Sequence, residues 1–242
     1  MCFTIEIKLT RDALEKRFKA DASVLGDFEF RYFYRAFDNP LIPVITQSSP
    51  SKIELMRWGL IPHWSKDLEH AEKVRRGTYN ARKESIAEKP SFKRAFQQSR
   101  CWVLVNGFFE WQQVGKEKIP WYIQQESNKP FAIAGLYDTW INPETGEDLR
   151  TFSIVTSPAN KLMEKIHNTK KRMPVILNEE KERQWISRGI PSEEHSSLLE
   201  PAKEGLLKAH TISKVISSRN ADPENEKIIS PYEFHQNTSL FD

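Results

Sequence analysis

Cys2 is the first residue whose type and position indicate chemistry. A small second residue generally permits removal of the initiator methionine, which would leave a free α-amine and a thiol on the same residue. Their reference pKa values are about 8 and about 8.5, so each is partly nucleophilic near neutral pH. Such an aminothiol condenses with an aldehyde to a Schiff base, and the thiol then closes a thiazolidine ring. On position alone, an ordinary residue of an edge strand is the simpler interpretation.

Asn80 and Arg82 place an amide and a guanidinium close together in one segment. The planar guanidinium fits the oxygens of a phosphate group. Asn80 is equally suited to cap a helix over residues 81–88, so this pair alone is a weak signal.

Glu110 lies among aromatic residues, shortly after Asn106-Gly107, a pair typical of a tight turn from which 108–112 would run back. A carboxylate partly removed from water can take up and release protons during a reaction. A solvated glutamate on the surface of a sheet is the alternative interpretation.

His167 is expected at the C-terminal end of a helix that begins at Ser157. The helix dipole there favours the protonated imidazole, which can act as a general acid. Lys170, Lys171 and Arg172 follow and could contact phosphates. A simple helix cap followed by a solvated loop would give the same pattern.

Trp64 precedes a polar, basic segment, 65–79, which is expected to be a surface loop. A tryptophan in that position could stack on a nucleobase, although most of the seven tryptophans are expected in the core. Cys101 lies in an apolar strand and is interpreted as buried and inert.

The elements that must position these side chains are many short strands and a few helices, without regular βαβ alternation. This pattern predicts an α+β fold, a single domain with an antiparallel sheet or barrel-like core and peripheral helices. The expected strands are 2–8, 28–37, 41–46, 53–58, 101–105, 108–112, 121–124, 131–135 and 151–156. The expected helices are 12–20, 81–88, 91–98, one from 157 and one over 178–188.

Composition narrows the class of protein. With 242 residues, 38% hydrophobic and 29% charged, the chain fits one large or two small globular domains. The net charge of +3 permits contact with nucleic acid without predicting it. There is no GxGxxG or GxxxxGK motif for nucleotide phosphates and no Cys or His pair with zinc spacing.

The compartment is expected to be the cytoplasm. The N-terminus lacks a signal-peptide pattern, and no apolar run reaches membrane-spanning length. The two cysteines cannot form a disulfide framework, and a reducing compartment would leave Cys2 as a free thiol.

Taken together, the motifs of this sequence resemble those of the SRAP family (SOS-response-associated peptidase, abasic-site processing proteins). The matches occur in family order over roughly residues 1–220, and the remainder is interpreted as a C-terminal tail. They are the initial Met-Cys, Trp58-Gly-Leu-Ile-Pro-His-Trp64, Asn80-Ala-Arg-Lys-Glu84, Arg100-Cys-Trp-Val-Leu-Val-Asn-Gly-Phe-Phe-Glu-Trp111, Phe131-Ala-Ile-Ala-Gly-Leu136, and His167 followed by Arg172-Met-Pro-Val-Ile-Leu177.

The resemblance implies one SRAP-like domain over 1–242, with a basic groove for single-stranded DNA. It implies that Cys2, after Met1 removal, forms a thiazolidine with the sugar aldehyde of an abasic site and shields the lesion during the DNA damage response. Asn80 would position the Cys2 end, Glu110 would assist proton transfer, and His167 would promote opening of the sugar ring. Weak lyase activity through β-elimination and N-terminal autopeptidase activity are further implications.

The same resemblance assigns Arg82 and Arg172 to phosphates and Trp64 to the DNA path, with no metal or cofactor. A monomer that joins the nucleoid when bound to DNA is expected. Two departures stand out. The family often begins Met-Cys-Gly-Arg, but this chain has Phe3-Thr4, which removes one expected phosphate contact. The family often has one residue between the histidine and Arg-Met-Pro, where this chain has Asn168 to Lys171.

Two other functions remain open from the sequence. An N-terminal nucleophile hydrolase, of the glutamine amidotransferase or autopeptidase type, would use the Cys2 thiol for acyl transfer and its amine as the base. A noncovalent single-strand binding module would leave Cys2 without a role and would form a salt-sensitive complex.

Overall fold

Five strands close into a barrel in the computed structural model of this chain, which describes residues 2–234. Around the ring, β10, β4, β3, β6 and β9 pair side by side, and β9 pairs again with β10. The expected α+β class with a barrel core is therefore confirmed. The bounds are β3 Leu41–Thr46, β4 Ser49–Trp58, β6 Arg100–Val105, β9 Phe131–Ile141 and β10 Asp148–Pro158.

One seam of the barrel differs from the expected antiparallel arrangement, because β10 pairs with β4 in parallel. A parallel pair requires a long crossover, and the chain between these strands, which includes the barrel strands β6 and β9, supplies it. β5 (Asn80–Arg82) also pairs with β10 in parallel, and β11 (Arg172–Pro174) pairs with the same part of β10. β12 (Ile176–Leu177) extends the sheet beside β9.

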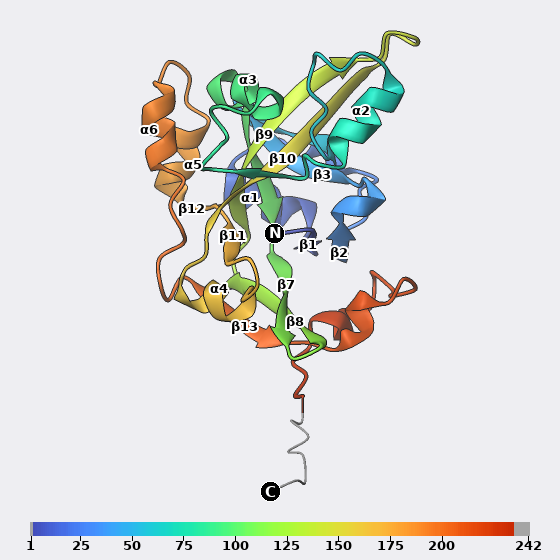
Figure 1. Cartoon of the computed structure of the whole chain (residues 1–242), viewed down its shortest axis with the longest axis vertical. Helices are drawn as coiled ribbons and strands as arrows, with labels where there is room; N and C mark the ends of the chain where they lie inside the picture. Colours follow the sequence, from blue (N-terminus) through green and yellow to red (C-terminus); the bar gives the residue numbers. More distant parts are fainter. Residues whose placement is uncertain (1, 235–242) are drawn as a thin grey trace, which may run out of the picture.

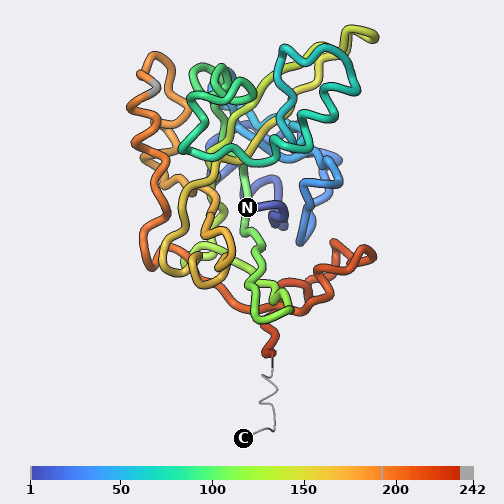
Figure 2. The backbone as a smooth tube through the Cα atoms, viewed as in Figure 1, coloured from blue at the N-terminus to red at the C-terminus, as the bar shows by residue number. Residues whose placement is uncertain are grey.

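A second, five-stranded sheet carries the beginning of the chain. Its order is β13-β8-β7-β1-β2, so β1 is an inner strand that pairs with both β7 and β2. In Figure 2 the C-terminal segment, orange to red, passes beneath the green strands, and its β13 adds to β8. The bounds are β1 Thr4–Ile7, β2 Arg31–Arg35, β7 Gly107–Val114, β8 Glu117–Gln125 and β13 Leu207–Thr211.

Asn106-Gly107 does not form the expected hairpin. β6 ends at Val105 inside the barrel, whereas β7 begins at Gly107 in the second sheet, so the chain passes from one sheet to the other. The glycine is required by packing, because a Cβ at Gly107 would lie 2.5 Å from Cε2 of Tyr122 and 2.8 Å from the Ile123 carbonyl oxygen. Its missing side chain permits the close approach of β8.

Helices lie around the barrel (Figure 1), with α3 above it and α5 and α6 along one side. Side-chain caps begin several of them: Asp67 accepts from the His70 N–H at α2, and Asn178 accepts from the Lys181 N–H at α5. The bounds are α1 Arg11–Phe18, α2 Leu68–Arg75, α3 Pro90–Gln98, α4 Lys161–Ile166, α5 Glu179–Trp185 and α6 Ser192–Ser197, and the short 3₁₀ turns are η1 Ser23–Leu25, η2 Ala36–Asp38, η3 Lys214–Ser217 and η4 Glu226–Ile229.

Three local predictions were wrong. The expected loop 65–79 contains α2, and the expected helix 81–88 is absent because residues 80–82 form β5 and residues 83–88 turns. The helix expected from Ser157 begins at Lys161 under an Asn160 cap, because Ser157 and Pro158 continue β10 and pair with β11. In each case a backbone pairing or a cap outweighed the local sequence preference.

The core lies inside the barrel and between the barrel and the second sheet. Trp58 and Phe152 stack across the parallel seam with ring centroids 6.0 Å apart. Cys101 is fully buried, as expected, and a Cβ at Gly135 would lie only 2.7 Å from its sulfur. Cys2 belongs to the same core cluster, so the start of the chain is packed into the interior.

Candidate active site at Cys2

Cys2 is fully buried and lies just before β1. β1 itself is paired between β2 and β7. Its thiol lies 3.8 Å from the Thr4 carbonyl oxygen, a weak contact. The pKa of the thiol is raised, first by burial and then by the negative charge of Glu110. The sulfur is therefore neutral at physiological pH. Met1, whose removal would free the α-amine, lies outside the described residues.

Asn80 contacts Cys2 directly. Its amide nitrogen donates a hydrogen bond of 2.9 Å to the Cys2 carbonyl oxygen. The side chain is free for this contact because Asn80 lies in β5, opposite Ile154 of β10, and does not cap a helix. Its Oδ1 atom is buried and has no hydrogen-bond partner among the described residues. A buried, unpartnered amide oxygen can accept a proton donor that enters the site.

Glu110 and His167 lie together in the interior, with 3.8 Å between Oε1 and Nδ1. Glu110 belongs to β7, opposite Trp121 of β8, and His167 is the residue at which α4 ends. Both are buried, so Glu110 is not a solvated surface carboxylate. The expected place of His167 at a helix C-terminus is also found.

The tautomer of His167 follows from its hydrogen bond. Nδ1 lies 2.9 Å from the Arg172 carbonyl oxygen, which can only accept, so Nδ1 carries a proton. Nε2 is then the nitrogen that can exchange a proton with a bound substrate. The structure thus brings Cys2, Asn80, Glu110 and His167 into one region, although their chemical roles stay predictions.

Arg172 is held inside the protein. Its guanidinium pairs with Glu84 at 2.5 Å and donates to the Thr156 carbonyl oxygen at 2.6 Å, and the side chain is only 10% exposed. The same residue accepts the hydrogen bond from His167 through its carbonyl. This geometry assigns Arg172 a bracing role, and the expected phosphate contact stays a prediction.

Arg82 and Trp64 are accessible. Arg82 is exposed at the end of β5, and its side chain makes no hydrogen bond or ion pair with the described residues. Trp64 is 41% exposed and its indole N–H donates to the Pro90 carbonyl oxygen over 3.4 Å. Both are placed to contact a ligand, but neither lines the cleft that contains Glu110.

A cleft of about 580 Å³ opens onto Glu110 and His167. Its other lining residues come from the second sheet, the loop after α4 and the C-terminal segment; they include Phe3, Phe37, Arg35, Trp111, Lys118 and Lys170. A larger hollow of about 690 Å³ lies on the other side of β2, but the described residues that line it include no cysteine or histidine. We therefore place the candidate site in the smaller cleft.

Phe3, Phe37, Arg35 and Lys118 were not expected to be site residues. Phe3 was visible only as a departure from the family's usual start, and Arg35 and Phe37 as part of an extended aromatic segment. Their convergence depends on the pairing of β1 with β2, which the sequence does not specify.

Among residues 2–234, no three His, Cys, Asp or Glu side chains are grouped so that they could hold a metal ion. No helix in the described part of the chain is long and apolar enough to cross a membrane.

Comparison with known families gives one model match, SOS response associated peptidase (SRAP), over residues 1–219. The chain belongs to the SRAP family. Abasic site processing protein YoqW of Bacillus subtilis (strain 168) is 36% identical over 228 residues, which are 93% of this SRAP chain and 98% of YoqW. Abasic site processing protein HMCES of Xenopus tropicalis is 35% identical over 198 residues, 73% of this chain and 57% of that protein.

Solved structures share the SRAP fold described above. A protein from Bacteroides thetaiotaomicron superposes with a TM-score of 0.90 at 34% identity and covers 96% of this chain and 100% of its own. A Bordetella bronchiseptica protein gives a TM-score of 0.76 at 23% identity, with 88% and 100% coverage, which shows the fold alone.

Proposed function

We propose that this SRAP protein processes abasic sites in DNA by forming a covalent thiazolidine through Cys2 after Met1 removal. The Asn80 hydrogen bond to the Cys2 carbonyl, beside the buried Glu110–His167 pair, carries the proposal. It directs the start of the chain toward a proton donor and a proton acceptor. The names of the relatives, abasic site processing proteins, support the same substrate class.

The order of steps is consistent with the state of the sulfur. The amine attacks first, which agrees with the raised pKa of the thiol that burial and Glu110 cause. His167 donates a proton to the ring oxygen as the closed sugar opens to its aldehyde, and the C1′ hydroxyl passes its proton to the Glu110 carboxylate. The α-amine then adds to C1′, and Glu110 returns that proton to the departing hydroxyl, so that loss of one water leaves an iminium ion. The sulfur attacks C1′ of the iminium as its proton passes to the Glu110 carboxylate, which closes the ring.

The groups around the site divide the work. Asn80 holds the Cys2 backbone, and its buried Oδ1 is an acceptor for the freed amine. Arg172 holds the His167 ring through its carbonyl oxygen. Arg82 and Lys170 lie at exposed positions from which they would contact phosphates of single-stranded DNA. Each step uses groups of this protein. In total, one aldehyde and one aminothiol give one thiazolidine and one water.

The test is a denaturing gel of purified protein incubated with a single-stranded oligonucleotide that bears one abasic site. Intact mass first establishes that Met1 is absent. We expect a shifted band with the wild type, no band with Cys2→Ala, and an undiminished band with Cys101→Ala, the matched control at the buried second cysteine. A wild-type sample without a band, or an equal band from Cys2→Ala, would overturn the proposal.

The two alternatives give different results in the same assay. A hydrolase would release ammonia from glutamine, or a peptide product, without a shifted band. A noncovalent binding module would form a complex that salt disrupts and that does not survive denaturation. The neutral thiol favours the amine-first reaction over direct acyl transfer by a thiolate.

A further inference from the structure

Phe3 and Phe37 form an aromatic pair at the protein surface. Their ring centroids lie 5.0 Å apart with an interplanar angle of 27°, a stacked arrangement. Phe37 is 62% exposed, the highest value for a large hydrophobic side chain in the described chain. Leaving so much aromatic surface in water forfeits burial free energy, so a stacked pair that ends in an open ring face indicates a place for a third flat group.

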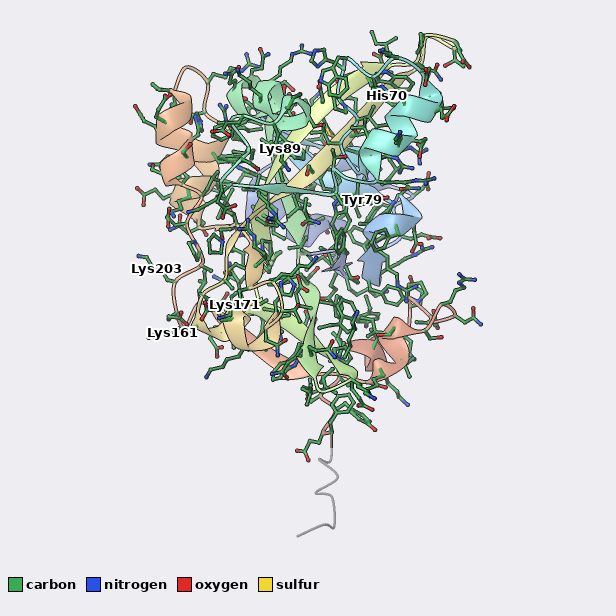
Figure 3. The ribbon with its side chains drawn as sticks, in the orientation of Figure 1. His70, Tyr79, Lys89, Lys161, Lys171 and Lys203 are labelled. Carbon is green, nitrogen blue, oxygen red and sulfur yellow. The ribbon has the colours of Figure 1, made fainter. Side chains whose placement is uncertain are left out.

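A backbone hydrogen bond and a third aromatic ring hold the pair in place. The Ala36 N–H, at the start of η2, donates to the Phe3 carbonyl oxygen over 2.9 Å. Tyr79, near the centre of the view in Figure 3, packs edge-on against both rings, with centroids 6.2 Å from Phe3 and 5.4 Å from Phe37. Tyr79 itself is buried and directly precedes Asn80. The open ring face is therefore preorganised, which lowers the entropic cost of binding.

Position links the pair to the proposed reaction. Phe3 follows Cys2 in the chain, and both phenylalanines line the cleft that contains Glu110 and His167. A DNA strand whose abasic sugar reaches Cys2 must therefore pass its neighbouring nucleotides across this surface.

Charge identifies the occupant. Arg35, Lys118 and Lys170 line the same cleft, in which Glu110 is the only acidic residue among the lining residues that are described. Arg35 is fixed at the cleft, because its guanidinium donates to the carbonyl oxygens of Ile216 and Ser218 at 2.8 Å each. Aromatic faces next to cationic side chains are the combination that binds single-stranded nucleic acid.

We propose that the Phe3–Phe37 pair is a stacking platform for the unpaired base next to the abasic nucleotide. This inference rests on the proposed function and names how the flanking strand is gripped. The base lies against the open face of Phe37, and the cleft cations neutralise the adjoining phosphates. Phe3 and Phe37 are thus positioning residues: they hold the lesion near Cys2 without taking part in bond formation.

The test uses single-stranded oligonucleotides that contain a tetrahydrofuran abasic analogue, which cannot react. 2-Aminopurine is placed immediately 5′ or 3′ of the analogue, or several nucleotides away, and its fluorescence is quenched when it stacks. We expect the wild type to quench one adjacent probe and not the distant probe. Phe37→Ala should lose this quenching and bind roughly tenfold more weakly, since stacking on an aromatic side chain contributes this order of affinity.

Two further variants make the result specific. Phe37→Tyr keeps a flat ring and should restore both quenching and affinity. Tyr232→Ala removes an aromatic that is 49% exposed but does not line the cleft, and it should behave as the wild type. A further oligonucleotide, with base-less spacers on both sides of the analogue, should bind wild type and Phe37→Ala alike.

The stacking platform would be overturned if Phe37→Ala quenched the adjacent probe as strongly as the wild type does. It would also be overturned if Phe37→Ala lost as much affinity for the base-less oligonucleotide as for the oligonucleotide with bases. A change of sedimentation coefficient with unaltered quenching would assign the pair to contact between two copies of the chain and would also overturn it. Failure of the covalent chemistry is scored separately, by the band on reactive abasic DNA. If the wild type gives a normal band on reactive abasic DNA and Phe37→Ala quenches the probe as the wild type does, only the stacking platform is rejected.

Discussion

The amide of Asn80 donates a hydrogen bond to the carbonyl of Cys2 over 2.9 Å, across 78 residues of sequence. This bond fixes the backbone that carries both the amine and the thiol. Its donor lies in β5, which the barrel strand β10 holds in parallel register. The orientation of the proposed nucleophile therefore depends on the barrel as well as on β1, the strand that follows the cysteine.

Asn80→Ala is expected to slow crosslinking. Loss of the amide leaves the buried Cys2 carbonyl unpaired, which costs about 1–3 kcal/mol and corresponds to a rate loss of roughly 10- to 100-fold if the bond is needed for reactive geometry. Single-turnover rates on abasic single-stranded DNA measure the effect. Asn80→Asp keeps an oxygen but removes the donor, so it should also be slow. A rate equal to wild type in both variants would contradict the positioning role.

The stability of the protein is expected to fall between about pH 4.5 and pH 7 because of Glu6. Burial raises the pKa of Glu6 from 4.5 to about 7, and the hydrogen bond from the Tyr122 hydroxyl only partly opposes this. The folded state therefore holds a proton that the unfolded chain has already released. The stabilisation is complete below the unfolded pKa and is lost as pH rises through the folded value, by roughly 3 kcal/mol in all.

Urea unfolding at pH 5 and pH 8 measures that change. Glu6→Gln cannot ionise but can still accept from Tyr122, so its stability should differ less between the two pH values than that of the wild type. An identical pH dependence in the two proteins would show that Glu6 does not contribute.

Arg172→Ala and Arg82→Ala should separate a structural arginine from a DNA-binding one. Arg172→Ala removes the donors to Thr156 and should lower the free energy of unfolding by about 2 kcal/mol. Arg82 is exposed, so Arg82→Ala should leave stability unchanged and reduce the salt dependence of DNA binding by about one phosphate contact. Thermal unfolding and binding isotherms at several salt concentrations distinguish them. If Arg172→Ala instead kept its stability and reduced the salt dependence of DNA binding, the result would support the predicted phosphate contact of Arg172.

Gly107→Ala is expected to destabilise the second sheet. The added methyl group would overlap Tyr122 and the Ile123 carbonyl oxygen, which belongs to rigid backbone, and such overpacking costs about 1–3 kcal/mol. Gly115→Ala is the control for glycine replacement in general, because nothing lies within 4 Å of its Cβ position, although its φ of +58° adds some strain. A larger loss at Gly115 than at Gly107 would contradict the packing argument.

Parts of the fold were predictable because their patterns are local. The apolar strand around Cys101 is buried as expected, and the Asn178 cap begins α5. A buried strand or a capped helix is recognised from adjacent residues, so no knowledge of distant partners is needed.

Other parts were not predictable because distant strands decided them. Asn80 would suit a helix cap, but pairing with β10 makes its segment a strand. Asn106-Gly107 would suit a hairpin, but the strands on its two sides belong to different sheets. The phosphate contact of Arg172 stays a prediction, but its ion pair with Glu84 and its hydrogen bond to Thr156 could not be expected from the sequence. A single sequence carries no signal for these pairings.

The sequence by itself determined the chemical groups: an aminothiol-forming Cys2, and an amide, a carboxylate and an imidazole at recognisable positions. Tertiary structure alone decided that these groups meet, that burial raises the pKa of the Cys2 thiol, and that Phe3 stacks on Phe37 at the cleft. The reason is physical: residue type sets what a side chain can do, whereas pKa, tautomer and reach depend on neighbours that only the closed barrel and its companion sheet bring together.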